Sequence, residues 1–107
     1  MLELAADLAA VVRLAARRLT PAGDVVFTYE PIIGGFGEQS ERHHVAPGRR
    51  SDGTAIGITK HRWHPGEVDG VVAGAAILVR AHRLFVAYHN PQAPIVYGIV
   101  WASRDAA

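Results

Sequence analysis

Apolar residues recur at helical spacing over residues 2–19 and predict one amphipathic helix. Acidic residues lie in the first half of this segment and arginines in its last turns, an order that complements the helix macrodipole. Thr20 and Pro21 end the helix, because proline disfavours helical geometry in the residue before it. The apolar side consists of Leu4, Leu8, Val11, Val12, Ala15 and Leu19.

Alternation of apolar and polar side chains predicts strands further along the chain. Residues 24–30 alternate in this way and are followed by Pro31, which ends a strand or places it at a sheet edge. Residues 54–60 form a second, shorter strand. Residues 84–89 and 95–102 form two more, joined as a hairpin.

Three segments lack such a clear period. Residues 34–53 and 61–70 are expected to be loops, since neither has apolar periodicity. Residues 71–80 are nearly all apolar and favour a buried strand. A helix over 69–82 is the alternative, which its two glycines weaken.

These elements predict a single α+β domain over residues 1–107. Its N-terminal amphipathic helix would pack on an antiparallel sheet of about five strands. Residues 71–103 contain no acidic residue, and both faces of the C-terminal strands are apolar or neutral. One helix can cover only one of these faces. Strong curvature of the sheet, self-association through the sheet, or binding to another protein could each bury the second face.

The apolar surplus favours a non-enzymatic binding or assembly subunit, homo-oligomeric, as the first functional hypothesis. A scaffold or virion-type component would fit this description. Residues 15–21, with the sequence AARRLTP, resemble the end of the first helix of small tail-completion proteins of bacteriophages. The resemblance covers about 20 residues and implies a ring-forming virion protein. The turn that follows such helices in that family is absent from this sequence.

Composition and charge exclude several classes of protein. Half of the 107 residues are apolar and 20% are charged, as in ordinary globular domains. There is no cysteine, which excludes disulfides, thiolate catalysis and cysteine-bound zinc. No apolar run reaches the roughly 20 residues needed to cross a membrane, and no secretory signal is visible. We therefore expect a cytoplasmic protein with no membrane contact. The net charge of +1 is too small to indicate a class of binding partner.

Histidines in the two predicted loops suggest the alternative function, a small histidine-dependent hydrolase. His61 and His64 have the HxxH spacing that can hold a metal, and His44 could add a ligand. No carboxylate stands at a fixed offset from them, so these are weak candidates and no metal is expected. The same two histidines with His43 could instead cleave RNA, one imidazole acting as base and another as acid. Lys60 and Arg62 would then stabilise the developing phosphorane charge.

A second set of loop residues is suited to binding rather than catalysis. Trp63 could stack on a base, while Arg49 and Arg50 could contact phosphates. Several acidic residues in the same loops dilute this basic patch, so nucleic acid is a weak expectation. Phe36 in the glycine-rich turn 34–37 is a further candidate binding residue. That turn lacks the spacing of phosphate-binding loops, and no cofactor is expected.

Overall fold

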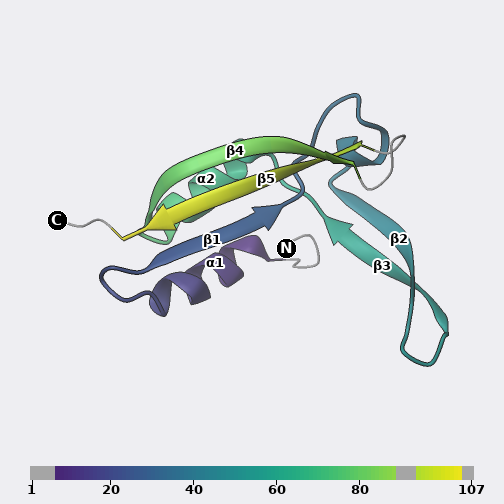
Figure 1. The fold of residues 1–107 in the computed structure, drawn as a ribbon, viewed down its shortest axis with the longest axis horizontal. Coiled ribbons are helices and arrows are strands. Elements are labelled where there is room, and N and C mark those ends of the chain that lie inside the picture. Colours follow the sequence, from purple (N-terminus) through teal and green to yellow (C-terminus); the bar gives the residue numbers. More distant parts are fainter. Residues whose placement is uncertain (1–6, 89–93, 105–107) are drawn as a thin grey trace.

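The chain folds into two helices, a 3₁₀ turn and five strands, as a computed structural model describes for residues 7–88 and 94–104 (Figure 1). The strands form two antiparallel sheets, one of three strands in the order β1-β5-β4 and one hairpin, β2-β3. The predicted α+β class and the number of strands are confirmed. The elements are α1 (Leu8–Arg17), β1 (Asp24–Tyr29), η1 (Gly37–Ser40), β2 (His43–Arg49), β3 (Ala55–His61), α2 (Pro65–Gly74), β4 (Leu78–Tyr88) and β5 (Pro94–Ser103).

The amphipathic pattern of α1 places its apolar stripe in the core. Asp7 caps the helix, since its Oδ1 accepts a hydrogen bond from the Ala10 backbone N–H at 3.0 Å. Leu8, Val12 and Ala16 are buried along one face. The predicted helix is thus confirmed over its second half, while residues 2–6 lie outside the described part of the chain.

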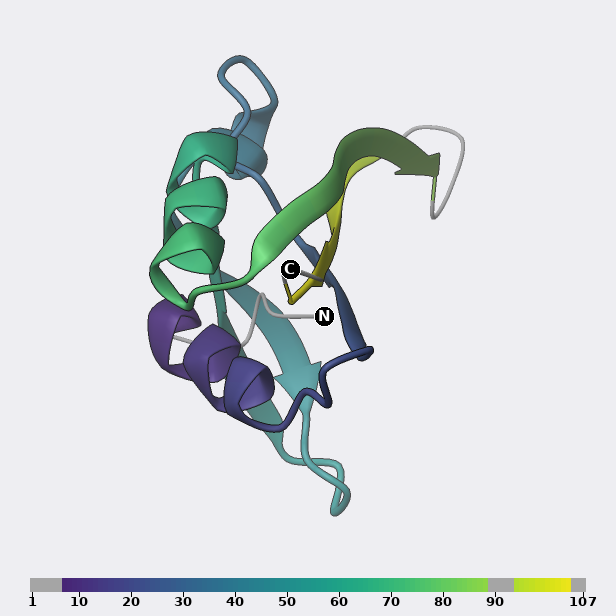
Figure 2. The same cartoon turned by 90° about the vertical axis from the view of Figure 1, so that its left-hand side faces the viewer.

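Both helices cover the same face of the three-stranded sheet (Figure 2). The alternation predicted for β1 holds, because Val25, Phe27 and Tyr29 all face the helices. The core between helices and sheet combines Leu8 and Val12 of α1, Val68 and Val72 of α2, Tyr29 of β1, and Val100 and Ala102 of β5.

The other face of this sheet carries the apolar surplus that the sequence indicates. Val26, Phe85 and Trp101 on this face are 60%, 44% and 45% exposed. The sheet is open and not strongly curled, so curvature does not bury them, and that option was wrong. Self-association through this face stays a prediction.

The segment after β3 was predicted incorrectly. The structure has a helix at Pro65–Gly74 and starts the next strand at Leu78, whereas a loop over 61–70 and a strand over 71–80 were expected. Three glycines lower the helix propensity of this segment. Pro65 at the first turn, a reciprocal cap between His64 and Glu67, and the burial of Val68 and Val72 stabilise the helix instead. Both described helices are only ten residues long, too short to cross a bilayer.

The predicted loop 34–53 also contains regular structure, namely η1 and β2. β2 lacks an apolar period of its own, and its pairing with β3 makes it a strand. The hairpin extends away from the main sheet (Figure 1). A parallel bridge between Pro31 and Trp63 ties the end of β1 to the segment that follows β3. The hairpin predicted from 84–89 and 95–102 is confirmed as β4-β5, with residues 89–93 outside the described part.

Candidate functional site

A cavity of about 270 Å³ lies where the end of β1, η1, β3 and the start of β5 meet. The lining residues come from three stretches of the sequence, 30–39, 60–62 and 94–95. Its wall has a polar side and an apolar side. It is lined by Glu30, Phe36, Gln39, Lys60, Arg62, Pro94 and Ile95.

Glu30 is the most unusual residue of this cavity, since it is an acidic residue that is only 1% exposed. Its Oε1 lies 3.8 Å from the Lys60 Nζ, and its Oε2 lies 3.7 Å from the Arg62 Nε. Both are ion-pair distances that exceed hydrogen-bond length. No described residue donates a hydrogen bond to Oε2. The carboxylate is therefore charge-balanced but retains an unused acceptor site.

The backbone explains how an acidic residue at a strand end becomes buried. The Trp63 N–H donates to the Glu30 carbonyl at 3.4 Å, and the Ile32 N–H donates to the Trp63 carbonyl at 3.1 Å. These bonds hold the segment after β1 beside the segment after β3. Lys60 and Arg62 are two residues apart, so an extended chain directs both side chains to the same side, toward Glu30.

Gln39 fixes the opposite wall of the cavity. Its amide forms two hydrogen bonds with the backbone of Val96: Nε2 donates to the carbonyl, and Oε1 accepts from the N–H at 3.0 Å. The side chain is 5% exposed. Gln39 therefore ties η1 to β5, and its amide has little capacity left for a ligand.

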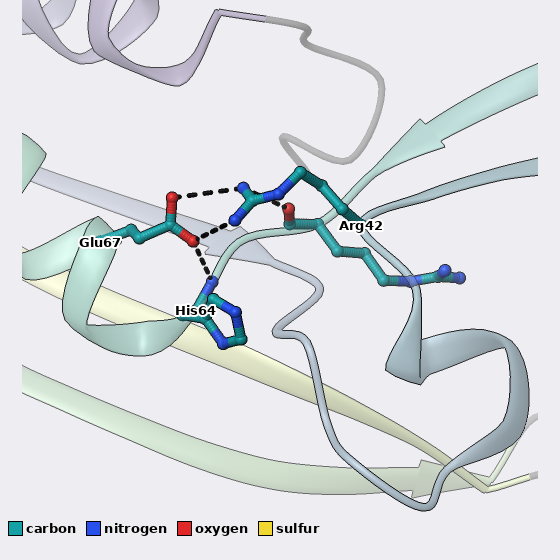
Figure 3. A network of polar contacts seen from close by, with 4 residues as sticks. Arg42, His64 and Glu67 are labelled. Atoms are coloured by element: carbon teal, nitrogen blue, oxygen red, sulfur yellow. Dashed lines mark hydrogen bonds and ion pairs between the residues drawn. The ribbon is translucent and has the colours of Figure 1, made fainter.

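A polar network next to the cavity positions the β3–α2 connection (Figure 3). The Arg42 guanidinium donates two hydrogen bonds to the Glu67 carboxylate, at 2.8 and 3.2 Å. Glu67 also accepts from the His64 backbone N–H at 3.0 Å, which completes the N-terminal cap of α2. The Arg42 hydrogen bonds, followed by the bond from His64, hold the pKa of Glu67 below its ordinary value.

The lowered pKa of Glu67 makes this network sensitive to acid. A carboxyl group whose pKa is lower in the folded state stabilises the fold above its unfolded pKa of about 4.3, and this contribution is lost as the pH falls below that value. We expect Glu67→Gln to lower the melting temperature at pH 7, and the difference from wild type to shrink as the pH falls through about 4. Thermal unfolding followed by circular dichroism across this range measures it.

Glu41→Gln is the matched control for this measurement, because it removes the same charge from an exposed carboxylate without a described hydrogen bond. Its difference from wild type should change little with pH. A pH-independent difference for Glu67→Gln would contradict the assigned role.

The structure separates the predicted histidines from the cavity. His43 and His61 pair across the β2-β3 hairpin, with their Nδ1 atoms 3.1 Å apart and their side chains at the surface. His64 is the N-cap residue of α2. His44 lies in β2, but its side chain is outside the described part. The described residues contain no group of three His, Cys, Asp or Glu side chains that could hold a metal ion.

Of the other predicted residues, Lys60, Arg62 and Phe36 meet in the cavity. Trp63 is 9% exposed and belongs to the core. Arg49 and Arg50 lie at the exposed tip of the β2-β3 hairpin. Glu30 and Gln39, which complete the polar side of the cavity, were not identified from the sequence.

A second polar chain lies beneath α2. The Tyr29 hydroxyl contacts His82 Nε2, and His82 Nδ1 lies 2.8 Å from Asp69 Oδ1. Burial, followed by the nearby Asp69 charge, raises the pKa of Tyr29 far above its ordinary value. Tyr29 is fully buried and does not line the cavity, so this chain ties α2 to β1 and β4.

Comparison with known proteins shows the fold of this chain. No protein family matches the sequence, and no curated relative is found by sequence. The solved structure of a SAM-dependent methyltransferase from Methanosarcina mazei is similar over 96% of this chain, with a TM-score of 0.73 and 10% identity. This chain spans 55% of the length of that protein. At such low identity the likeness establishes a shared fold.

This likeness corrects the first functional hypothesis. The protein that shares this fold is an enzyme, which contradicts the expectation of a non-enzymatic assembly subunit. The homo-oligomeric scaffold and virion-type roles lose their support with it. The alternative hypothesis, a small histidine-dependent hydrolase, agrees better with this likeness because it is an enzyme, although the similar protein is a methyltransferase.

Proposed function

We propose that this chain forms the acceptor-binding part of a methyl-transferring enzyme, with the Glu30 cavity as the acceptor site. The observation that carries this proposal is the buried Glu30 side chain, whose Oε2 accepts no described hydrogen bond. Buried polar atoms are nearly always paired, so an unpaired acceptor in a cavity wall suits a hydrogen bond from a ligand. The fold shared with a SAM-dependent methyltransferase supports methyl transfer as the reaction class.

The lining residues match the needs of an acceptor molecule. A hydroxyl or amine that receives a methyl group must lose a proton, and a carboxylate within hydrogen-bond reach can accept it. Glu30 Oε2 would orient the acceptor O–H or N–H and then take its proton. Phe36, Pro94 and Ile95 supply apolar walls for the body of the molecule. Lys60 and Arg62 balance the carboxylate charge before the proton arrives.

This cavity is not a site for the whole of S-adenosylmethionine. Sites for ligands of that size have volumes of roughly 300–1,000 Å³, above the 270 Å³ of this cavity. The ligand is also a sulfonium cation. Lys60 and Arg62 lie beside the single carboxylate of the cavity and would repel such a group. The methyl donor would therefore be held by residues other than those that line this cavity.

Phenol and anisole test the acceptor site as a matched pair. Anisole is O-methylated phenol and lacks the hydrogen that Glu30 would bind. In titrations of ¹⁵N-labelled protein, we expect phenol to shift the amides of the cavity residues and to bind about tenfold or more tightly than anisole. Equal binding of the two probes, or no shift at the cavity residues, would overturn the proposal.

Variants assign the preference to one side chain. Glu30→Gln keeps the shape of the residue but replaces a charged acceptor with a neutral, weaker one. The variant should therefore bind phenol no more than a few-fold more tightly than anisole, because a neutral hydrogen bond is weaker than a charged one. Glu41→Gln, which changes an exposed carboxylate outside the cavity lining, should keep the wild-type preference.

A further inference from the structure

A second cavity of about 290 Å³ lies at the opposite end of β5 from the first, between the C-terminal ends of α1 and α2. Arg13 and Arg17 of α1 and Arg104 after β5 line it, and none of the described residues in its wall is acidic. The remaining wall consists of small residues and Ile77. Guanidinium groups with no carboxylate beside them are suited to an anion, and their planar forks match phosphate oxygens.

The local structure does not need all three arginines. Cations often lie at helix C-termini because they neutralise free carbonyl groups there. Here several of the last carbonyls already have partners: Ala15 and Ala16 of α1 accept from the backbone N–H groups of Arg18 and Leu19. Ala73 of α2 accepts from the N–H of Ala76. The guanidinium groups of Arg13 and Arg17 make no described hydrogen bond or ion pair.

Two features of the wall favour a bound anion. Arg13 and Arg17 are four residues apart on α1, so two like charges are neighbours on one helix face, an unfavourable pair that an anion would relieve. Arg104 is held in place, because its Nη2 donates to the Ala16 carbonyl at 2.9 Å and its carbonyl accepts from Arg80 Nη2 at 3.1 Å. One guanidinium is therefore fixed beside two that are free to close on a ligand.

The turn that forms the back of the cavity is strained. Ala76 has a φ of 61°, the only positive φ of a non-glycine residue in the described part of the chain. Left-handed backbone of this kind is unfavourable for alanine and is found disproportionately at ligand sites. The turn brings the backbone of residues 74–77 against the arginines of α1.

We propose that this arginine-lined cavity binds the phosphate group of an anionic ligand, independently of the acceptor site. The ligand class is a phosphate ester or pyrophosphate, whether carried by a small molecule or by a nucleic acid backbone. Inorganic pyrophosphate is the probe, titrated into the full chain by isothermal calorimetry at constant low ionic strength. Binding should weaken steeply with added KCl, as expected for exposed charge pairs.

The decisive comparison uses two double variants with the same net charge. Arg13→Gln with Arg17→Gln should weaken pyrophosphate binding by about tenfold or more, since each charge-assisted hydrogen bond contributes that much. Arg49→Gln with Arg50→Gln removes two charges from the hairpin tip and should leave the affinity within about twofold, the residual effect of screened charge. Glutamine and arginine have similar helix propensity, so α1 should remain folded, as circular dichroism can verify.

Two results would overturn the proposal. One is the absence of binding heat up to millimolar pyrophosphate. The other is an equal loss in both double variants, which would show that bulk charge alone attracts the ion.

If pyrophosphate binds, two further ligands distinguish the sources of the phosphate group: uridine 5′-monophosphate, a monoester, and uridylyl-uridine, a diester. Preference for the monoester indicates a small phosphorylated ligand, and equal binding indicates a nucleic acid backbone.

Discussion

Gly98→Ala is expected to lower the free energy of unfolding by about 3 kcal/mol, the upper end of what overpacking a core costs. A methyl group at this position would lie 2.3 to 2.8 Å from the Cε1, Cζ and Oη atoms of Tyr29. The Tyr29 ring is fully buried, and its hydroxyl is held by His82, so it cannot move aside without breaking that contact. Glycine at this point of β5 makes room for the tyrosine of β1.

Gly70→Ala is the matched control, because it makes the same change where space is open. Apart from neighbouring residues and the backbone of α2 itself, no described atom lies within 4 Å of the methyl group that it would add. Alanine has the higher helix propensity, so this variant should be more stable than wild type by about 1 kcal/mol. Urea denaturation monitored by circular dichroism compares the two. A Gly98→Ala variant as stable as wild type would contradict the packing described around Tyr29.

The elements predicted correctly from the sequence are those in which apolar residues recur at a regular spacing. The helical stripe of α1 and the alternation of β1 place Leu8, Val12 and Tyr29 in the core as predicted. The sequence did not predict β2, whose residues alternate weakly and include Pro47 and Gly48. That strand depends on β3, where Ile58 packs so close to Gly48 that a Cβ there would lie 2.3 Å from its Cδ1. Such cross-strand pairing is a tertiary effect that local propensity does not contain.

The helix α2 was missed for a different reason. Its glycines lower the helix propensity of the segment. The features that stabilise the helix are the cap at its N-terminus and the burial of Val68 and Val72. The Arg42–Glu67 bond that supports the cap joins residues 25 positions apart. A local reading of residues 61–74 could find the proline and the capping pair but not the arginine that holds Glu67.

Only some of the residues that line the candidate site were predicted from the sequence. Lys60, Arg62 and Phe36 were selected for their chemistry, and the fold brings them together. Glu30 was missed because the alternation of β1 places it on the same face as Val26 and Thr28, the face turned away from the helices. The chain turns at Pro31, and the bridge to Trp63 buries the carboxylate instead. A charged residue at the end of an apolar strand, directly before a proline, is the signal that could have identified it.

Arg62→Met is the second change with a large expected effect, and it tests the charge balance of the acceptor site. Arg62 is 3% exposed, and its Nε lies 3.7 Å from the buried Glu30 Oε2. Removing one partner of a buried ion pair leaves an uncompensated charge, so the free energy of unfolding should fall by about 3–5 kcal/mol. Lys60 stays near Oε1, which places the result at the lower end of this range.

The double variant Glu30→Leu with Arg62→Met separates the folding role of this pair from its binding role. Replacing both charges with apolar groups removes the buried charge, so most of the lost stability should return. The refolded double variant should nevertheless lose the preference for phenol over anisole, because the acceptor oxygen is gone. A single Arg62→Met variant within about 1 kcal/mol of wild type would show an ion pair as weak as those at protein surfaces. The Glu30 carboxylate would then be too well solvated to act as the buried acceptor that the proposed function requires.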